Sequence, residues 1–67
     1  MKVEINHHII EVAPGITSLS ELLETEGFTG VGQAVAIDNT VVPKAKWAET
    51  VLKDGMKIIV ISAVCGG

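Results

Sequence analysis

The last apolar run of the chain constrains the fold more than any other feature. After Lys57, the side chains up to Val64 are almost continuously apolar, and Ser62 is the one polar residue among them. A strand with one solvated face alternates apolar and polar residues, whereas a strand contacted on both faces reads as an unbroken apolar run. The run therefore predicts a central strand of a sheet, covered or contacted on both faces.

A single main helix is predicted to pack on this sheet. Ser18 and Glu21 have the spacing of a capping box, in which the serine hydroxyl binds the N3 backbone amide and the glutamate binds the cap amide. The helix should begin at about Leu19 and stop at Gly27. Its core-facing stripe is made of leucines three to four residues apart, namely Leu19, Leu22 and Leu23.

A helix this short leaves one face of the sheet open. About nine helical residues span about 13 Å, enough to cover only one face of four or five strands. Both alternating sets of the final strand are apolar, but Ser62 is in register with Ile58 and Val60. We therefore expect Ile58 and Val60 on the open face, with Ile59 and Ile61 toward the helix. Contiguous exposed apolar surface marks docking sites, so Ile58 and Val60 are candidate partner-docking residues.

The other elements are short and separated by turn residues. Lys2 to Asn6 alternates polar and apolar side chains, which predicts a strand with Val3 and Ile5 on its inner face. In the first half of the chain we predict a turn at Asn6-His7, a strand at 8–12 closed by Ala13-Pro14-Gly15, and a flexible loop at 28–33. In the second half we predict a short, mostly buried strand at 34–37, a turn at Asp38-Asn39 and a strand at 41–42 ended by Pro43. A short helical turn at 44–49 should present Trp47 inward.

Composition excludes several classes of function. Eight acidic residues against five basic ones give a net charge of -3, the wrong sign for binding a phosphate backbone, so no nucleic acid is expected as a partner. The single cysteine allows no internal disulfide. We find no N-terminal signal and no apolar run of about 20 residues in the sequence, so we expect no membrane location. We expect one domain, residues 1–67, in the reducing cytoplasm.

The chain ends in Cys65-Gly66-Gly67, and this tail is the first candidate for function. Glycine weakens strands and helices because it loses the most backbone freedom on ordering, so the pair is not there for stability. Backbone without Cβ atoms is slim enough to enter a narrow channel, and the carboxylate of Gly67 is anionic at neutral pH. We expect residues 64–67 to form a flexible tail that presents this carboxylate.

Other residues of types that could bind a metal or act in catalysis are better explained by structural roles. His7 and His8 are adjacent, so in a strand they point to opposite faces, and no cysteine or carboxylate cluster completes a metal site. Asp38 and Asp54 lie in turn sequences, where aspartate is favoured for backbone hydrogen bonding. We therefore predict no catalytic residue and no metal ligand among them.

A set of short motifs in the second half of the chain is shared with a known family. The motifs are Ala36-Ile37-Asp38-Asn39, Val41-Val42-Pro43, Trp47-Ala48, Asp54-Gly55, the final apolar strand and Gly66-Gly67. Together with the order of the predicted elements, they resemble the ThiS family, the sulfur carriers of the thiamin pathway. The resemblance implies an α+β fold, the ubiquitin-like β-grasp, in which a mixed sheet of four to five strands packs one main helix on one face.

The resemblance implies a protein substrate rather than an enzyme. In such carriers an E1-like adenylating enzyme that uses ATP and Mg²⁺ activates the carboxylate of Gly67, and sulfur from a sulfur donor protein displaces AMP to leave a thiocarboxylate. Thiazole synthase then takes the sulfur. The carrier binds no cofactor, and Gly66 and Cys65 serve to present the tail, although the family more often has a small or polar uncharged residue in place of Cys65. Two alternatives stay open: a sulfur carrier for molybdopterin or amino-acid synthesis, and a ubiquitin-like interaction or modifier module.

Overall fold

The computed structural model describes residues 1–62. Its elements, in chain order, are β1 (Lys2–Ile5), β2 (His8–Glu11), α1 (Leu19–Thr25), β3 (Gln33–Ile37), β4 (Thr40–Val42), the 3-10 helix η1 (Lys44–Glu49) and β5 (Lys57–Ser62). The predicted tail 64–67, with Cys65, Gly66 and Gly67, lies outside the described residues, as do the last two residues of the predicted final strand.

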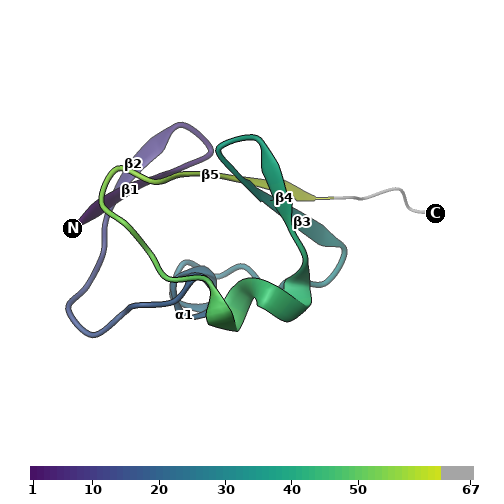
Figure 1. The fold of residues 1–67 in the computed structure, drawn as a ribbon, viewed down its shortest axis with the longest axis horizontal. Coiled ribbons are helices and arrows are strands. Elements are labelled where there is room, and N and C mark those ends of the chain that lie inside the picture. The colour runs from purple at the N-terminus through teal and green to yellow at the C-terminus, as the bar shows by residue number, and fades with distance from the viewer. Residues whose placement is uncertain (63–67) are drawn as a thin grey trace.

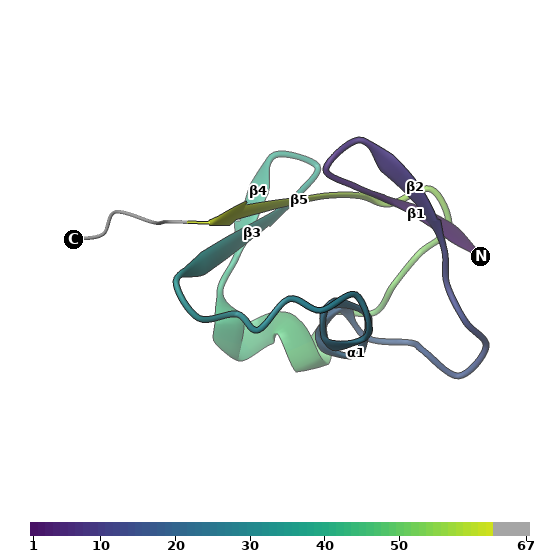
Figure 2. The ribbon, with the colours of Figure 1, turned by 180° about the vertical axis from the view of Figure 1, so that it is seen from behind.

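Within residues 1–62, five strands form one mixed sheet in the order β2-β1-β5-β3-β4. β5 pairs parallel with β1 and antiparallel with β3, while β2 and β4 are the outer strands. The central position predicted for the final strand is confirmed. α1 and η1 lie together on one side of the sheet (Figure 1), and the view from behind shows the same two layers (Figure 2). One face of the sheet is thus covered by helices, and the opposite face carries no helix of the described chain.

The helix begins as its sequence predicts. The Ser18 hydroxyl accepts a hydrogen bond from the Glu21 amide at 3.2 Å, and the Glu21 carboxylate accepts one from the Ser18 amide at 3.1 Å. Both halves of the capping box are therefore present. The same carboxylate also accepts a hydrogen bond from the Thr17 amide at 3.2 Å. Two donors that would be left unpaired at a helix start are satisfied in this way.

The helix ends in a Schellman motif built around Gly27. The backbone of Gly27 has a φ of +87°, a conformation that side chains with a Cβ atom rarely adopt. Its N–H donates to the Glu24 carbonyl at 3.1 Å, and the N–H of Phe28 donates to the Leu23 carbonyl at 2.8 Å. The predicted C-terminal stop at Gly27 is confirmed.

The core lies between the helical layer and the sheet. Trp47 is buried, and its indole Nε1–H donates to the Val42 carbonyl at 2.9 Å, which ties η1 to β4. Val3 and Ile5 face inward, as the alternation in the first strand predicts. Among residues 1–62, the buried apolar residues are Val3, Ile5, Val12, Leu19, Leu22, Leu23, Val35, Trp47, Leu52, Ile58 and Val60.

Two tight turns with left-handed backbone close the two hairpins. Asn6 and His7 have φ values of +49° and +70°, and Asp38 and Asn39 have φ values of +50° and +67°. Positive φ at both central residues is the geometry of the type I′ turn, whose twist matches that of the flanking strands. Both predicted turns are confirmed. The two turns lie side by side on the side of the sheet away from the helices (Figures 1 and 2).

Candidate functional site

The strand that leads toward the C-terminal tail is held differently on its two sides. β3 accompanies β5 to its last described residue, with Gln33 paired to Ser62. β1 ends earlier, and its last register pair with β5 is Ile5 with Ile58. Beyond Ile58, the described part of β5 has a strand neighbour on the β3 side only.

Asn6, the first residue after β1, forms two hydrogen bonds to β5. Its backbone N–H donates to the Ile58 carbonyl at 2.9 Å, and its side-chain Oδ1 accepts from the Val60 N–H at 2.8 Å. The side chain thus supplies an acceptor on the side of β5 that β1 has left. The sequence predicted Asn6 only as a turn residue, because asparagine is favoured in type I′ turns by its backbone conformation alone. No local sequence pattern reveals a contact between residues that are 54 positions apart.

The two predicted docking residues are not on the open face. Ile58 and Val60 are buried in the core with exposed fractions of 0% and 8%, so this prediction was wrong. The face of β5 is set by its neighbour: Ile58 pairs with Ile5 of β1, and directly paired residues lie on the same face of a sheet. Ser62 shares this phase but is exposed, because it lies at the end of the strand, past the residues that the helices cover.

The open face instead carries the alternate set of β5 residues. Ile59 pairs with Ala36, and Ile61 pairs with Ala34, while Val41 of β4 pairs with Ala36 from the other side. Ile61 and Val41 are 55% and 68% exposed. We call these neighbours on β5, β3 and β4 the open-face patch: Ala34, Ala36, Val41, Ile59 and Ile61. The patch reaches the end of β5, so it lies directly beside the point where the chain continues toward Gly67.

Charged side chains border the patch at its other end. Glu4 and Lys57 are paired across β1 and β5, and they line a hollow of about 390 Å³ between the two hairpin turns, together with His7, Asp38, Asn39 and Ile59. Ile9 on β2 is 73% exposed but lies opposite Glu4. Glu4 and Lys57 therefore lie between Ile9 and the open-face patch.

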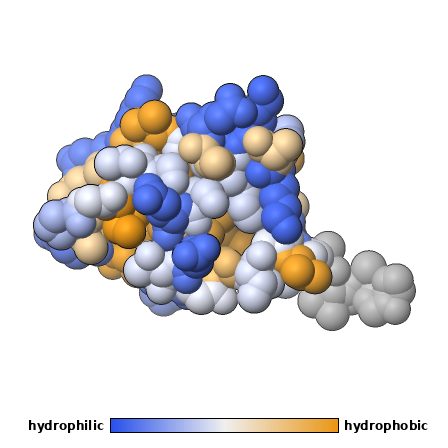
Figure 3. All heavy atoms as spheres, turned by 90° about the horizontal axis from the view of Figure 1, so that it is seen from below, coloured by the Kyte–Doolittle hydropathy of each residue, from blue (hydrophilic) through white to orange (hydrophobic). Residues whose placement is uncertain are grey.

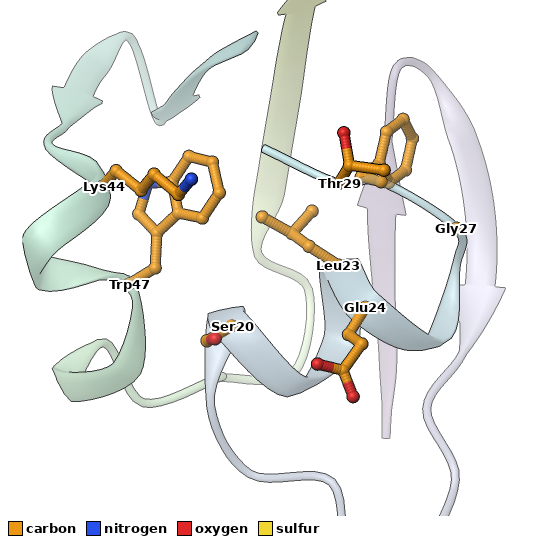
Figure 4. A pocket seen from close by; sticks show the side chains of 8 residues that line it. Ser20, Leu23, Glu24, Gly27, Thr29, Lys44 and Trp47 are labelled. Atoms are coloured by element: carbon orange, nitrogen blue, oxygen red, sulfur yellow. The ribbon is translucent and has the colours of Figure 1, made fainter. Parts of the chain in front are cut away.

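A second hollow, of about 300 Å³, lies in the helical layer between α1 and η1. In Figure 4, Leu23 points into it from α1, and Lys44 lies beside the ring of Trp47 on the η1 side. Figure 3 shows the helical face, on which strongly hydrophobic side chains are scattered among hydrophilic and neutral ones. This hollow and the open-face patch lie on opposite layers of the molecule.

Among the described residues, the resolved pKa shift lies at the helix cap and not at the open-face patch. Backbone hydrogen bonds from Thr17 and Ser18, with a further bond from the Ser18 hydroxyl, lower the pKa of Glu21 from its ordinary value of 4.5. Asp54 accepts a hydrogen bond from the Lys2 amide at 2.9 Å, so its carboxylate binds backbone 52 positions away rather than the local turn backbone that its sequence position predicts. Among residues 1–62, no group of three or more His, Cys, Asp and Glu side chains could hold a metal ion. None of the described helices combines the length and the apolar character that a membrane span requires.

The mixed sheet, with its first and last strands parallel at the centre and one main helix on one face, defines the ubiquitin-like β-grasp class of proteins. The crystal structure of the thiamine biosynthesis protein (ThiS) from Geobacter metallireducens superposes with a TM-score of 0.83 at 20% identity, over 100% of both chains. An NMR solution structure of a thiamine biosynthesis protein from the same organism gives a TM-score of 0.76 at 20% identity, over 100% of this chain and 88% of the other. These likenesses confirm the predicted fold.

Sequence comparison narrows the class to one family. The model of the ThiS family matches residues 2–67. The chain is also 33% identical over 67 residues to the sulfur carrier protein ThiS of Escherichia coli (strain K12), with 100% of both chains covered. The chain therefore belongs to the ThiS family, as the motifs in its second half indicated.

Proposed function

We propose that this chain is the sulfur carrier of thiamin thiazole formation, and that it acts as a protein substrate rather than as an enzyme. Membership of the ThiS family and the name of the Escherichia coli relative support the carrier role. The observation that carries the proposal is the position of the open-face patch, which ends at Ile61 beside the start of the tail. A partner that covers the patch would have the C-terminal residues directed into its own active site.

The chemistry explains why a carrier needs partners. A carboxylate resists nucleophilic attack because its charge repels the incoming sulfur. In the proposed first step, a carboxylate oxygen of Gly67 attacks the α-phosphorus of ATP, pyrophosphate leaves, and an acyl adenylate forms. In the second step, the terminal sulfur of a donor persulfide attacks the acyl carbon, and AMP leaves with the bridging oxygen, which gives an acyl disulfide. A thiol of a partner protein then attacks the donor sulfur of this S–S bond, which releases the thiocarboxylate and leaves a disulfide between the thiol and the donor. ATP and Mg²⁺ belong to the activating enzyme, and the carrier binds neither.

Because the partners carry out the chemistry, this chain has to supply only a tail that reaches their active sites and a surface that fits them. The five residues after Ser62 span at most about 17 Å when fully extended, which is enough to enter a buried pocket from the end of the sheet. Gly66 and Gly67 keep this arm slim, and Cys65 precedes them. The open-face patch, and not Ile58 and Val60, provides the docking surface.

Three partner proteins follow from this proposal. An E1-like adenylating enzyme activates Gly67, a sulfur donor protein supplies a persulfide, and thiazole synthase consumes the thiocarboxylate. We assign this chemistry to the cytoplasm, where ATP is available and thiols stay reduced. Carriers for molybdopterin or amino-acid synthesis would share the first two steps and differ in the synthase that accepts the sulfur.

Intact mass spectrometry tests the proposal. The purified full chain is incubated with a ThiS-activating enzyme, ATP, Mg²⁺ and a sulfide source, and we expect a mass increase equal to the exchange of one oxygen for one sulfur. Adding thiazole synthase and its other substrates should return the chain to its original mass. The Escherichia coli ThiS protein serves as the positive control. If that protein is converted while this chain stays unmodified, or if this chain forms a ladder of conjugates, the proposal is wrong.

A further inference from the structure

We propose that Asn6 is a positioning residue for the C-terminal tail, because its side chain fixes the path of β5 beyond the end of β1. This inference rests on the proposed function, since it concerns delivery of Gly67 to an activating enzyme. It starts from the two hydrogen bonds that Asn6 makes to β5, one to the Ile58 carbonyl at 2.9 Å and one from the Val60 N–H at 2.8 Å.

The two bonds continue the parallel ladder between β1 and β5 by one step. In a parallel pair, one residue donates to the carbonyl before its partner and accepts from the N–H after its partner. Asn6 does both around Ile59, but the acceptor is its side-chain Oδ1 instead of its own carbonyl. The substitution is needed because the backbone of Asn6 already turns, with a φ of +49°. The side chain thus extends the ladder while the main chain leaves it.

The position makes two demands that few residues meet. The φ of +49° is strained for most residues with a Cβ atom, whereas glycine, asparagine and aspartate tolerate it. Glycine would fit the turn but has no acceptor for the Val60 N–H. Only asparagine and aspartate offer both the conformation and a suitably short acceptor, so Asn6 serves the strand as well as the turn.

The β3–β4 turn provides a matched comparison within the same chain. Asp38 occupies the corresponding first position, with a φ of +50°. Its backbone N–H donates to the Lys57 carbonyl at 3.2 Å. Within residues 1–62, however, the Asp38 side chain makes no hydrogen bond to β5. Replacing either residue with glycine suits the turn, but only the change at Asn6 removes a contact to the strand that leads to the tail.

The expected consequence is a change in the population of the binding-competent strand. Without the Asn6 side chain, the part of β5 after Ile58 keeps only its pairing with β3. If this part of β5 then leaves its place beside β1 more often, a smaller fraction of the protein is competent to bind. The apparent affinity for the activating enzyme falls in proportion to that competent fraction. The chemical step inside the enzyme is unaffected, because Gly67 reaches the same acyl-transfer site once bound. The loss of one neutral hydrogen bond shifts the ratio of aligned to misaligned strand by about 2- to 10-fold, and this shift is the upper limit of the fall in apparent affinity.

The experiment compares Asn6→Gly, Asn6→Asp and Asp38→Gly with the wild-type chain. In adenylation kinetics, we expect Asn6→Gly to raise the KM for the carrier, by at most about 10-fold, with kcat unchanged. Asn6→Asp should restore the wild-type KM, and Asp38→Gly should retain it. Amide hydrogen exchange should show faster exchange at Val60 in Asn6→Gly, while Val35 in the core keeps its protection.

Each outcome decides between the role in positioning and its alternatives. If Asn6→Gly shows the wild-type KM, or if Asp38→Gly raises the KM equally, the positioning role is overturned. Unchanged exchange at Val60 in Asn6→Gly overturns it as well, independently of any enzyme. Should the wild-type chain itself fail to be adenylated, the proposed function fails and the positioning role falls with it. A reduced kcat at constant KM would contradict the argument from populations.

Discussion

Gly30 lies so close to Trp47 that a Cβ atom on this glycine would come within 3.0 Å of Cζ3 of the indole. The same Cβ atom would lie 3.1 Å from Cε of Lys44. The loop between α1 and β3 therefore rests on the ring that anchors η1 to the sheet. A loop predicted from its glycines to be flexible includes a buried residue in contact with the core.

Gly30→Ala should destabilise the protein for two separate reasons. Its φ of +83° is unfavourable for alanine by about 1–2 kcal/mol, and the new methyl group would crowd Trp47. Gly55→Ala is the matched control, because Gly55 has a φ of +81° but nothing within 4 Å of an added Cβ atom. Urea unfolding of both variants measures the two effects. Equal losses of stability would show that the contact with Trp47 yields without cost.

Ile61→Lys should weaken binding to the activating enzyme without unfolding the carrier. Ile61 is 55% exposed at the tail end of the open-face patch, and burying such a side chain in an interface contributes about 1.5–3 kcal/mol. We therefore expect the KM for the carrier to rise by about 10- to 100-fold. Ile9→Lys is the control, because Ile9 is also an exposed strand isoleucine but lies outside the patch. A KM that responds equally to both changes would contradict docking through the patch.

Gly67→Ala should leave the stability unchanged and reduce adenylation. The substitution lies beyond the described residues and adds a Cβ atom next to the reacting carboxylate. A displacement of about 1 Å at a reacting group can cost about 10²-fold in rate, so we expect a loss of that order in AMP formation. Thermal unfolding in the same buffer is the control for folding. Equal rates of AMP formation by the variant and the wild-type chain would refute the role of a slim terminus.

The capping box should make stability depend on pH through Glu21. Because the folded-state pKa of this carboxyl is lowered from 4.5, the ionised form stabilises the folded state at pH values above 4.5. That contribution disappears as the pH falls through the lowered folded-state pKa. Glu21→Gln removes the charge and keeps an acceptor, so the stability difference from wild type should shrink on acidification below 4.5.

Urea unfolding midpoints at neutral pH and at acidic pH test this expectation. Glu24→Gln is the control, because Glu24 lies on the same helix but its side chain takes no part in the cap. A difference between wild type and Glu21→Gln that is independent of pH would contradict the expectation. A response of Glu24→Gln as large as that of Glu21→Gln would assign the effect to overall charge instead.

Most secondary structure was predictable because its causes are local in sequence. The capping box at Ser18 and Glu21, the glycine stop at Gly27 and the type I′ turns each depend on a few neighbouring residues. The alternation of polar and apolar residues around Val3 and Ile5 likewise identified the inner face of β1. Such patterns act through backbone conformation and side-chain period, which are properties of a short segment by itself.

The candidate site was predicted less well, and the reason lies in β5. Both of its faces are apolar, so the side-chain period carries no information about which face is buried. A slip of one residue in register would exchange the two sets of side chains. The choice is made by pairing with β1, where Ile5 lies beside Ile58, and this contact joins opposite ends of the chain.

By itself, the sequence determined the β-grasp order of elements, the central place of the last strand and the family to which the chain belongs. These follow from local patterns and from motifs that are read in order along the chain. Only the tertiary structure decided that Ile59 and Ile61, rather than Ile58 and Val60, face outward, and that Asn6 holds Val60. Both facts depend on strand register between distant segments, which is settled when the sheet packs against α1 and η1.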